Sequence, residues 1–248
     1  MANYKCQQKT ISVRILVACE YSGIVRDAFT AKGHDAWSCD VLPTESLGNH
    51  IQDDVLNHLD KGWDMMIAHP PCTYLSNAGA RFLYPKKKLN LERYELGLEA
   101  KKFFMALYNA PIDKICVENP ISSKIFELPK HTQTIQPYEY GHPFSKRTRL
   151  WLKNIPPLQP TNNVKNYKTL MPSNTGGKKR GQSHRYVAIT AKEASKTFPG
   201  VATAMADQWN IQSTKVPGNW FNKGGKDRQK NRSKFFEGIA EAMSKQWS

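Results

Sequence analysis

The stretch Val13–Cys19 (VRILVAC) decides the fold of this 248-residue chain. It is a short apolar run rich in β-branched residues, which favours a buried strand. The run ends at Glu20–Gly23 (EYSG), and helix-like apolar spacing follows over Val25–Lys32. A strand, a glycine-containing turn and a helix in this order indicate the first half of a βαβ unit.

Further strands and helices alternate along the chain. Asp35–Cys39, Met65–Ala68 and Lys114–Val117 are predicted strands, and Leu91–Tyr108 has a helical pattern. This alternation predicts a parallel α/β sheet with helices on both faces and with ligands at the carboxyl ends of the strands. The polar residues that directly follow the strands are therefore the candidates for a functional site.

Charge is distributed unevenly between the two parts of the chain. From Trp151 onward there are 17 Lys and Arg but 5 Asp and Glu, whereas the first 150 residues hold 19 and 16. A near-neutral body followed by a basic region suggests a surface that binds a polyanion, although a basic face that only aids solubility is the alternative. No apolar run approaches the ~18 residues of a membrane span. The polar stretch Met1–Thr10 lacks the apolar core of a signal peptide, so we expect a cytoplasmic protein without membrane contacts.

The number and spacing of the cysteines argue against both a disulfide framework and a structural metal. The number is odd, and no two form a CxxC pair or a zinc-like spacing. The five cysteines are Cys6, Cys19, Cys39, Cys72 and Cys116. Four of them are expected to be small buried hydrophobes. Cys72 differs because it follows Pro70-Pro71, a stiff turn after a strand that would hold the thiol at the sheet edge as a nucleophile.

Two other strand boundaries carry polar groups. Glu118-Asn119 follows Lys114–Val117, and a carboxyl group beside a thiol suits a proton donor to a ring nitrogen. Arg147 and Arg149 alternate at the start of a strand predicted over Thr148–Leu152, so both side chains are expected on one face. Seen alone, each motif could be an ordinary solvated loop or charged strand face.

Together these motifs resemble those of the cytosine-5 DNA methyltransferases. Pro71-Cys72 looks like the Pro-Cys motif of that family, Glu118-Asn119 like its Glu-Asn motif, and Arg147-x-Arg149 like its Gln-x-Arg-x-Arg motif, in the same order. The resemblance covers roughly residues 12–152, and the short chain resembles a phage or bacterial member of a restriction-modification type. It implies a Rossmann-like, S-adenosylmethionine-dependent methyltransferase sheet. The catalytic residues that it implies are Cys72, Glu118, Arg147 and Arg149.

The resemblance also implies the reaction. The Cys72 thiolate would add to C6 of a cytosine while Glu118 bonds to N3, so that C5 becomes a carbon nucleophile able to accept a methyl group from S-adenosylmethionine. Arg147 and Arg149 would support the base and stabilise the thiolate. Because C5 cannot be reached inside a stacked duplex, the cytosine of double-stranded DNA would be flipped out.

The same resemblance implies a cofactor site at the first strand. The family's Phe-x-Gly-x-Gly turn corresponds to Val17–Gly23, where only Gly23 keeps a glycine. Asp40 is expected to accept the ribose hydroxyls and Asp54 to contact the adenine amino group, although either could instead be a helix N-cap. The implied cofactor-binding residues are Ala18, Cys19, Glu20, Tyr21, Ser22, Gly23, Asp40, Asp54 and Pro70.

The region after the resemblance is small and basic. We divide the chain into a catalytic domain (1–153), a reduced target-recognition or loop region (154–184) and a basic helical C-terminal region (185–248). The last region contains a repeat, since Ser195–Trp209 and Ser233–Trp247 are identical or near-identical at 11 of 15 positions. A short recognition region favours phosphate contacts over sequence readout. The candidates for nucleic-acid binding are Ser76, Lys178, Lys179, Arg180, Arg185, Lys226, Arg228, Lys230, Arg232 and Lys234.

Three alternatives stay open at the level of sequence. An amino methyltransferase of similar fold uses an Asp/Asn/Ser-Pro-Pro motif followed by an aromatic residue, where this chain has His69 and Cys72. A catalytically silent DNA-binding relative is suggested by the altered glycine turn. The Cys72 chemistry could also act on RNA, or transfer a group other than methyl.

Overall fold

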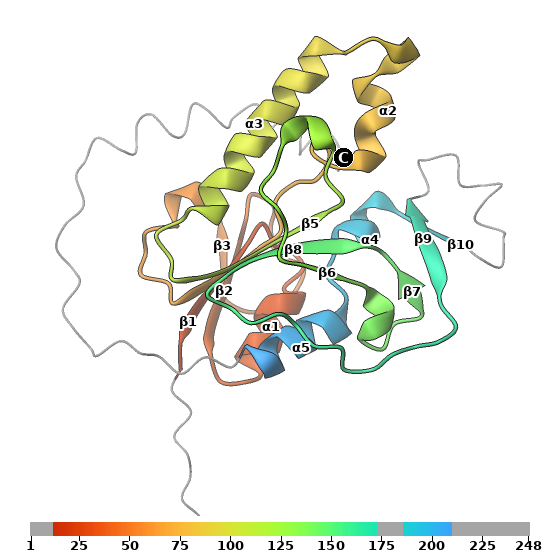
Figure 1. Ribbon diagram of the computed structural model, residues 1–248. Helices are drawn as coiled ribbons and strands as arrows, with labels where there is room; N and C mark the ends of the chain where they lie inside the picture. Colours follow the sequence, from red (N-terminus) through yellow and green to blue (C-terminus); the bar gives the residue numbers. More distant parts are fainter. Residues whose placement is uncertain (1–11, 173–185, 210–248) are drawn as a thin grey trace, which may run out of the picture.

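The computed structural model describes residues 12–172 and 186–209 (Figure 1). Its centre is a seven-stranded sheet in the order β3-β2-β1-β4-β5-β8-β6. The strands of this sheet are β1 (Arg14–Ala18), β2 (Asp35–Asp40), β3 (His50–Gln52), β4 (Met65–Ala68), β5 (Lys114–Pro120), β6 (Gln133–Ile135) and β8 (Thr148–Lys153). The long predicted strands are therefore present close to their expected positions.

The sheet reverses its strand order at β1. The chain passes from β1 to β2 and β3 on one side, and then returns to place β4 on the other side of β1. β4 pairs in parallel with both β1 and β5, and Ala68 lies level with Ala18 and Val117. Such a reversal is the switch point at which open α/β sheets bind their ligands. The predicted Rossmann-like α/β fold class is confirmed.

One strand departs from the expected parallel arrangement. β8 lies between β5 and β6 and runs antiparallel to both. Between β6 and β8 the chain forms only η5 (Pro137–Glu139) and β7 (Phe144–Ser145), without the crossover helix that a parallel strand would need. β8 therefore begins at the carboxyl edge of β5, where Arg149 lies opposite Asn119. The basic motif reaches the predicted site from the start of a strand.

Helices cover both faces of the sheet. α3 (Leu91–Tyr108) packs on one face, where Phe104 meets the edge of Trp151 at 5.0 Å between ring centroids. α1 (Ile24–Thr30) and α5 (Pro199–Gln208) pack together on the other face. In Figure 1, α3 rises above the sheet while α1 and α5 lie below it. No helix in the part of the chain that the structure describes is long and apolar enough to cross a membrane.

Several short elements were not expected from the sequence. A three-stranded sheet in the order β10-β9-β7 lies within the region expected to be a loop or irregular insert and at its borders. Strands and turns of this length carry too little periodicity to be recognised. The remaining elements are η1 (Val55–Asn57), η2 (Asn77–Gly79), α2 (Ala80–Leu83), η3 (Pro85–Lys87), η4 (Lys124–Phe126), β9 (Lys168–Pro172), β10 (Tyr186–Ile189) and α4 (Ala191–Ser195).

Helix α5 belongs to the packed core although it falls in the region from residue 185 onward. Val201 and Met205 are buried in one cluster with Ile15 of β1. The Gly200 N–H donates a hydrogen bond to His142 Nε2 at 2.8 Å, which fixes α5 to the loop before β7. The second copy of the repeat, Ser233–Trp247, lies outside the described residues.

We predict that Gly200→Ala lowers the free energy of unfolding by about 1–3 kcal/mol. A Cβ at this position would lie 2.0 Å from the backbone oxygen of Tyr140, so α5 would have to move away from its loop. Urea-induced unfolding measures the change. Thr203→Ala, on the exposed face of the same helix, is the control and should change stability by less than about 0.5 kcal/mol. Equal stability of Gly200→Ala and the wild type would contradict this packing.

Candidate active site

The candidate active site lies at the carboxyl edge of the sheet. Cys19 follows β1, Asp40 ends β2, His69 and Cys72 follow β4, and Glu118 lies near the end of β5. These groups are close enough for their charges to act on one another, as Asp40 does on Cys19 and Glu118 on Cys72. The structure thus brings the predicted nucleophile, the predicted acid and the predicted cofactor turn to one edge of the sheet.

The loop that carries Cys72 is held from two sides. The Ser76 N–H donates to the Cys72 carbonyl oxygen at 2.8 Å, and Ser76 also forms a β-bridge with Ser122, which follows β5. From α3, Arg93 donates to the Thr73 carbonyl oxygen at 2.9 Å. These contacts fix the backbone on both sides of the thiol. Ser76 itself is 8% exposed and helps to hold this loop, and its predicted contact with nucleic acid stays a prediction.

The Cys72 thiol is partly exposed and lies between two opposite charges. Burial raises the pKa of the Cys72 thiol, the Lys146 ammonium lowers it and the Glu118 carboxylate raises it, with a net increase above the usual value. The thiol is therefore protonated in the resting site at neutral pH. A bound substrate that changes this balance of charges would be needed to favour the thiolate.

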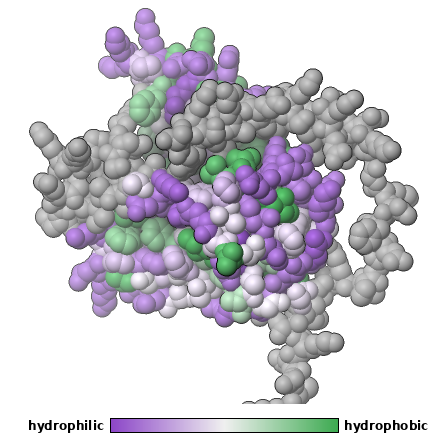
Figure 2. Space-filling model, turned by 180° about the vertical axis from the view of Figure 1, so that it is seen from behind, coloured by the Kyte–Doolittle hydropathy of each residue, from purple (hydrophilic) through white to green (hydrophobic). Residues whose placement is uncertain are grey.

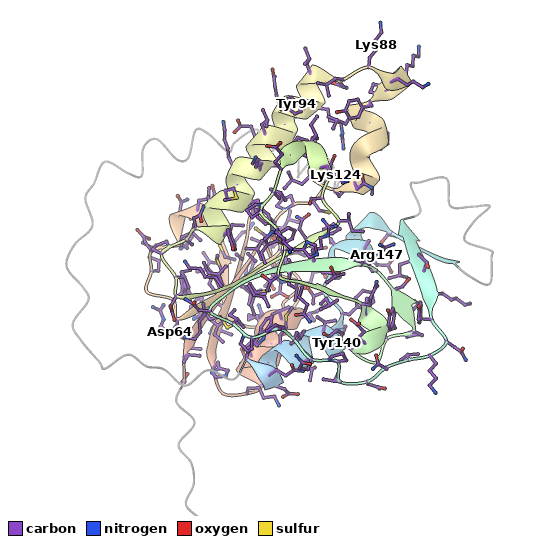
Figure 3. All side chains as sticks on the ribbon, viewed as in Figure 1. Asp64, Lys88, Tyr94, Lys124, Tyr140 and Arg147 are labelled. Carbon is purple, nitrogen blue, oxygen red and sulfur yellow. The ribbon has the colours of Figure 1, made fainter. Side chains whose placement is uncertain are left out.

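The cation that acts on Cys72 is Lys146, which the sequence analysis did not single out. Arg147 is exposed at the start of β8 (Figure 3), and Arg149 donates to Ser122 Oγ at 3.4 Å. Neither arginine is among the charges that shift the pKa of Cys72, contrary to the expected stabilisation of the thiolate by both. Lys146 lies between β7 and β8 and lines a pocket with Glu118. Arg149 lies opposite Asn119, which points to the other face of the sheet from Glu118.

Lys146 and Glu118 line one pocket beside α5. The ammonium group is anchored because Nζ donates to the Ala194 carbonyl oxygen at 2.7 Å. The pocket combines charged groups of the sheet edge with apolar groups of α5. Its residues are Glu118, Ile135, Pro137, Lys146, Thr148, Lys196, Thr197, Phe198, Val201 and Met205.

His69 and Glu118 form a buried hydrogen-bonded pair. His69 Nδ1 lies 2.8 Å from Glu118 Oε2, and the two side chains are 9% and 13% exposed. Burial lowers the pKa of His69, but the hydrogen bond and charge of Glu118 outweigh burial and raise it. Burial raises the pKa of Glu118, but His69 and Lys146 outweigh burial and lower it. The hydrogen bond therefore favours the protonated form of His69 and the ionised form of Glu118.

The turn after β1 already uses part of its backbone and its acidic side chain, since the N–H groups of Cys19 and Glu20 donate to the Cys39 carbonyl oxygen at 2.8 and 3.3 Å. Cys19 and Gly23 take left-handed conformations, with φ of 58° and 75°. Glu20 accepts the N–H groups of Val25 at 2.7 Å and of Arg26 at 3.2 Å, so its carboxylate caps the first turn of α1. The Glu20 carboxylate thus has a structural role at the start of α1, and its predicted cofactor contact stays a prediction.

The other residues expected at the cofactor site are distributed around this turn. The Tyr21 hydroxyl lies 3.3 Å from Ser195 Oγ of α4, and Ser22 Oγ donates to Glu20 at 3.3 Å. Ala18 and Pro70 are buried beneath the turn, where β1 and β4 end. Their predicted role in cofactor binding stays a prediction.

Asp40 and Asp54 differ in how their carboxylates are used. Asp40 is 6% exposed, and its Oδ1 accepts the N–H of Leu42 at 2.9 Å. Burial raises the pKa of Asp40 to about 6, and no cation pairs with this carboxylate within residues 12–172 and 186–209. Asp54 accepts the N–H of Leu56 at 3.0 Å and caps η1, which is the structural alternative considered for it. Asp40 is thus the carboxylate at this edge of the sheet to which a polar ligand would donate hydrogen bonds.

A projecting surface above the site also escaped the sequence analysis. α2, η3 and the start of α3 form a helical arm in Figure 1, and we call residues 82–91 the arm tip. The arm tip carries Lys86, Lys87 and Lys88 next to Tyr84 and Leu91, which are 44% and 66% exposed. Figure 2 shows hydrophilic and hydrophobic groups side by side on this projection, and in Figure 3 Lys88 points away from the body.

The basic residues expected from the sequence to bind nucleic acid lie outside the described residues. They are Lys178, Lys179, Arg180, Arg185, Lys226, Arg228, Lys230, Arg232 and Lys234. The described part of the chain offers the arm tip as a second cationic surface.

We predict that Asp40→Asn changes the pH dependence of stability. Because the folded-state pKa of Asp40 is about 6 and its usual value is 3.8, the folded protein binds this proton more tightly than the unfolded chain. The free energy of unfolding therefore falls as the pH rises from about 4 through about 6. The variant should gain about 2–3 kcal/mol on the wild type between pH 4 and pH 7.5.

Urea unfolding at both pH values measures this gain, with Asp60→Asn, an exposed acid far from the β2 end in the chain, as the control. A difference between Asp40→Asn and the wild type that is the same at both pH values would contradict the raised pKa of Asp40.

Comparisons with known proteins give only remote similarities. No family model matches the chain, and no curated protein matches its sequence. A putative DNA modification methyltransferase encoded within an E. coli prophage is 11% identical at a TM-score of 0.38 and covers 62% of this chain. The Entamoeba histolytica methyltransferase EhMeth is 12% identical (TM-score 0.36, 63% of this chain). The S. pombe Dnmt2 methyltransferase is 14% identical (TM-score 0.35, 64% of this chain). This chain spans about half the length of each, 52%, 56% and 52% respectively. These similarities assign no family, and the function rests on the chain's own residues.

Proposed function

We propose that this chain is a DNA cytosine-5 methyltransferase that uses Cys72 as its nucleophile and S-adenosylmethionine as methyl donor. The observation that carries the proposal is the convergence of Cys72, Glu118 and Lys146, since the carboxylate and the ammonium both act on the thiol. A nucleophilic thiol, an acid and a cation at one sheet edge are the groups needed to add to C6 of a cytosine and to neutralise N3.

Each of these residues has a defined task in the reaction. The Cys72 sulfur forms a bond to C6, and the electrons of the ring shift toward N3. Glu118 forms a hydrogen bond with N3. C5 then has the carbon nucleophile character that methyl transfer requires. Solvent water then takes the C5 proton, the electrons of the C5–H bond form the C5=C6 double bond, and the C6–S bond breaks to release the thiolate. Lys146 stabilises the thiolate, and the exposed Arg147 is left to contact DNA.

The crevice at the ends of β1 and β2 fits the proposed cofactor. Asp40 offers a buried carboxylate without a cation partner in the described residues, as two ribose hydroxyls would require. The turn Cys19–Gly23 leads into the N-terminus of α1 and offers backbone groups, and Asp54 lies near enough to act on Cys19. S-adenosylmethionine, when bound, supplies an electrophilic methyl group.

The arm tip supports DNA as the partner. Its lysines offer contacts to phosphates, and its exposed Tyr84 and Leu91 offer apolar surface to unstacked bases. Lys124 and Arg147 lie on the same side of the sheet as the base of the arm, whereas Asp64 lies at the opposite edge (Figure 3). The arm tip and the Cys72 loop would therefore meet the same stretch of DNA, from which the target cytosine is flipped out.

A second candidate is a DNA-binding relative without catalytic activity. The protonated resting state of Cys72 and the internal use of the Glu20 carboxylate favour it. It predicts DNA binding without any Cys72-dependent product.

We predict that DNA from cells that express the wild-type protein contains 5-methylcytosine and that DNA from cells with Cys72→Ala contains none above background. Loss of the thiol removes the C6 adduct on which C5 reactivity depends. Nucleoside mass spectrometry measures both samples, with Cys6→Ala as a control that changes another cysteine. Equal absence of a modified cytosine from wild-type and Cys72→Ala samples would sink the proposal. A different Cys72-dependent cytosine product would keep the nucleophile and revise the donor.

We predict that Lys87→Gln/Lys88→Gln weakens DNA binding about tenfold at 0.1 M salt and reduces the slope of log affinity against log salt by about 1–2, because two phosphate contacts are lost. Fluorescence anisotropy with a short duplex measures both quantities. The matched control is Lys32→Gln/Lys61→Gln, which removes the same charge from turns before β2 and β4 at the opposite edge of the sheet. Equal salt slopes for the two double variants would exclude the arm tip as a DNA contact.

A further inference from the structure

The His69–Glu118 pair has features that packing alone does not explain. His69 follows β4 and Glu118 belongs to β5, so the 2.8 Å hydrogen bond joins the two strands that border the Cys72 loop. His69 Nε2 is buried and has no hydrogen-bond partner among the residues that the structure describes. An orphaned buried nitrogen is costly, and such groups in native proteins call for a functional or ligand-related explanation.

The proposed reaction needs a proton that Glu118 does not hold in the resting site. When a thiolate adds to C6, negative charge develops at N3 of the ring, and a proton must reach that atom. The Glu118 carboxyl group is ionised at neutral pH because His69 and Lys146 lower its pKa more than burial raises it. A carboxylate alone accepts hydrogen bonds and cannot donate to N3.

We propose that His69 stores the proton that Glu118 passes to N3 of the target cytosine, an inference that rests on the proposed function. His69 forms a hydrogen bond with Glu118 and reaches the cytosine only through it. It is therefore a positioning residue that supplies a proton to Glu118. In a protonated His69 the proton on Nδ1 faces Glu118 Oε2, because these two atoms lie 2.8 Å apart. Passage of this proton through the carboxyl group leaves neutral His69 and restores the Glu118 carboxylate.

The protons and electrons of this step balance without any further reactant. The thiol proton of Cys72 leaves to solvent and the sulfur–C6 bond forms. The C5=C6 electron pair shifts along the ring, and N3 takes the proton from the pair. On elimination the C6–S bond breaks, the ring double bond reforms, and the proton of N3 returns to Glu118 and His69.

The groups that face His69 are consistent with a proton store. Glu118 from β5 and Glu20 from the turn after β1 favour the imidazolium, while Lys146 before β8 opposes it. The two carboxylates come from strands on either side of β4. An apolar residue or a glutamine would fill the same space without a titratable proton, so the storage role can be separated from packing.

The experiment is the exchange of the cytosine C5 hydrogen in heavy water, followed by mass spectrometry of a DNA oligonucleotide in the absence of donor. Exchange requires only the C6 adduct, so it reports Cys72, Glu118 and His69 without the cofactor. The variant is His69→Gln, whose amide can still donate to Glu118 but stores no proton. In this variant Glu118 must hold the proton alone and can do so only at lower pH.

We expect His69→Gln to lower the exchange rate at least about 100-fold at pH 8 and less than about tenfold at pH 6. The pH above which the exchange rate declines should also be lower in this variant than in the wild type. The control is His58→Gln, which makes the same replacement in another histidine–carboxylate pair, His58 Nε2 with Asp53 Oδ2 at 2.8 Å, outside the Cys72 loop. Its pH profile should match that of the wild type.

The outcomes separate this inference from the proposed function. Exchange by the wild type with an equal loss at every pH in His69→Gln would overturn proton storage and leave the methyltransferase proposal standing. No exchange by the wild type at any pH would overturn both. Should His69→Gln fail to fold, the imidazole ¹⁵N titration of wild type and Glu118→Gln is the second measurement. It should show a lower pKa of His69 in Glu118→Gln, and an unchanged pKa would refute the pair.

Discussion

The pairing of β4 between β1 and β5 is the constraint on which the site depends. It places Ala68 level with Ala18 and with Val117, so the residues that follow β4 lie between the turn of β1 and the end of β5. His69 then reaches Glu118, and the prolines carry the chain onward to Cys72. A shift in this register by one residue would turn His69 to the other face of the sheet and separate it from Glu118.

Several carboxyl and thiol groups of the site are buried close to one another, and this changes their pKa values. Burial raises the pKa of Asp40 to about 6, and the Cys72 thiol is held in its protonated form by burial and by Glu118 against the effect of Lys146. Such groups lower the stability of the ligand-free fold. Perturbed groups of this kind cluster at functional sites, and a cofactor at Asp40 and a base beside Cys72 would relieve the charge imbalance.

Sequence reasoning identified the fold class because its signals are local, whereas the role of the Cys72 loop stays a prediction. Met65–Ala68 and Leu91–Tyr108 are long or apolar enough to show their periodicity, and both occur at the predicted residues.

The antiparallel direction of β8 has no such local signal, since it follows from the lack of a crossover helix after β6. The approach of Lys146 to Glu118 depends on the path of the chain between β7 and β8, which also has no local signal. The partnership of His69 with Glu118 joins residues 49 positions apart and could only be found in the fold. The predicted division at residue 185 concerns sequence composition, whereas α5 packs with β1 because its apolar residues complete that face of the sheet.

The central claim is that Cys72 forms a bond to cytosine C6, and covalent trapping tests it most directly. A DNA duplex in which 5-fluorocytosine replaces cytosine is incubated with the full chain and S-adenosylmethionine, because fluorine at C5 cannot leave as a proton and the adduct persists. Intact-mass measurement and peptide mapping then identify the linked residue. The account predicts a protein–DNA adduct at Cys72 in the wild type and none in Cys72→Ser. Methylation of ordinary DNA without any trapped adduct, or an adduct on another residue, would contradict it.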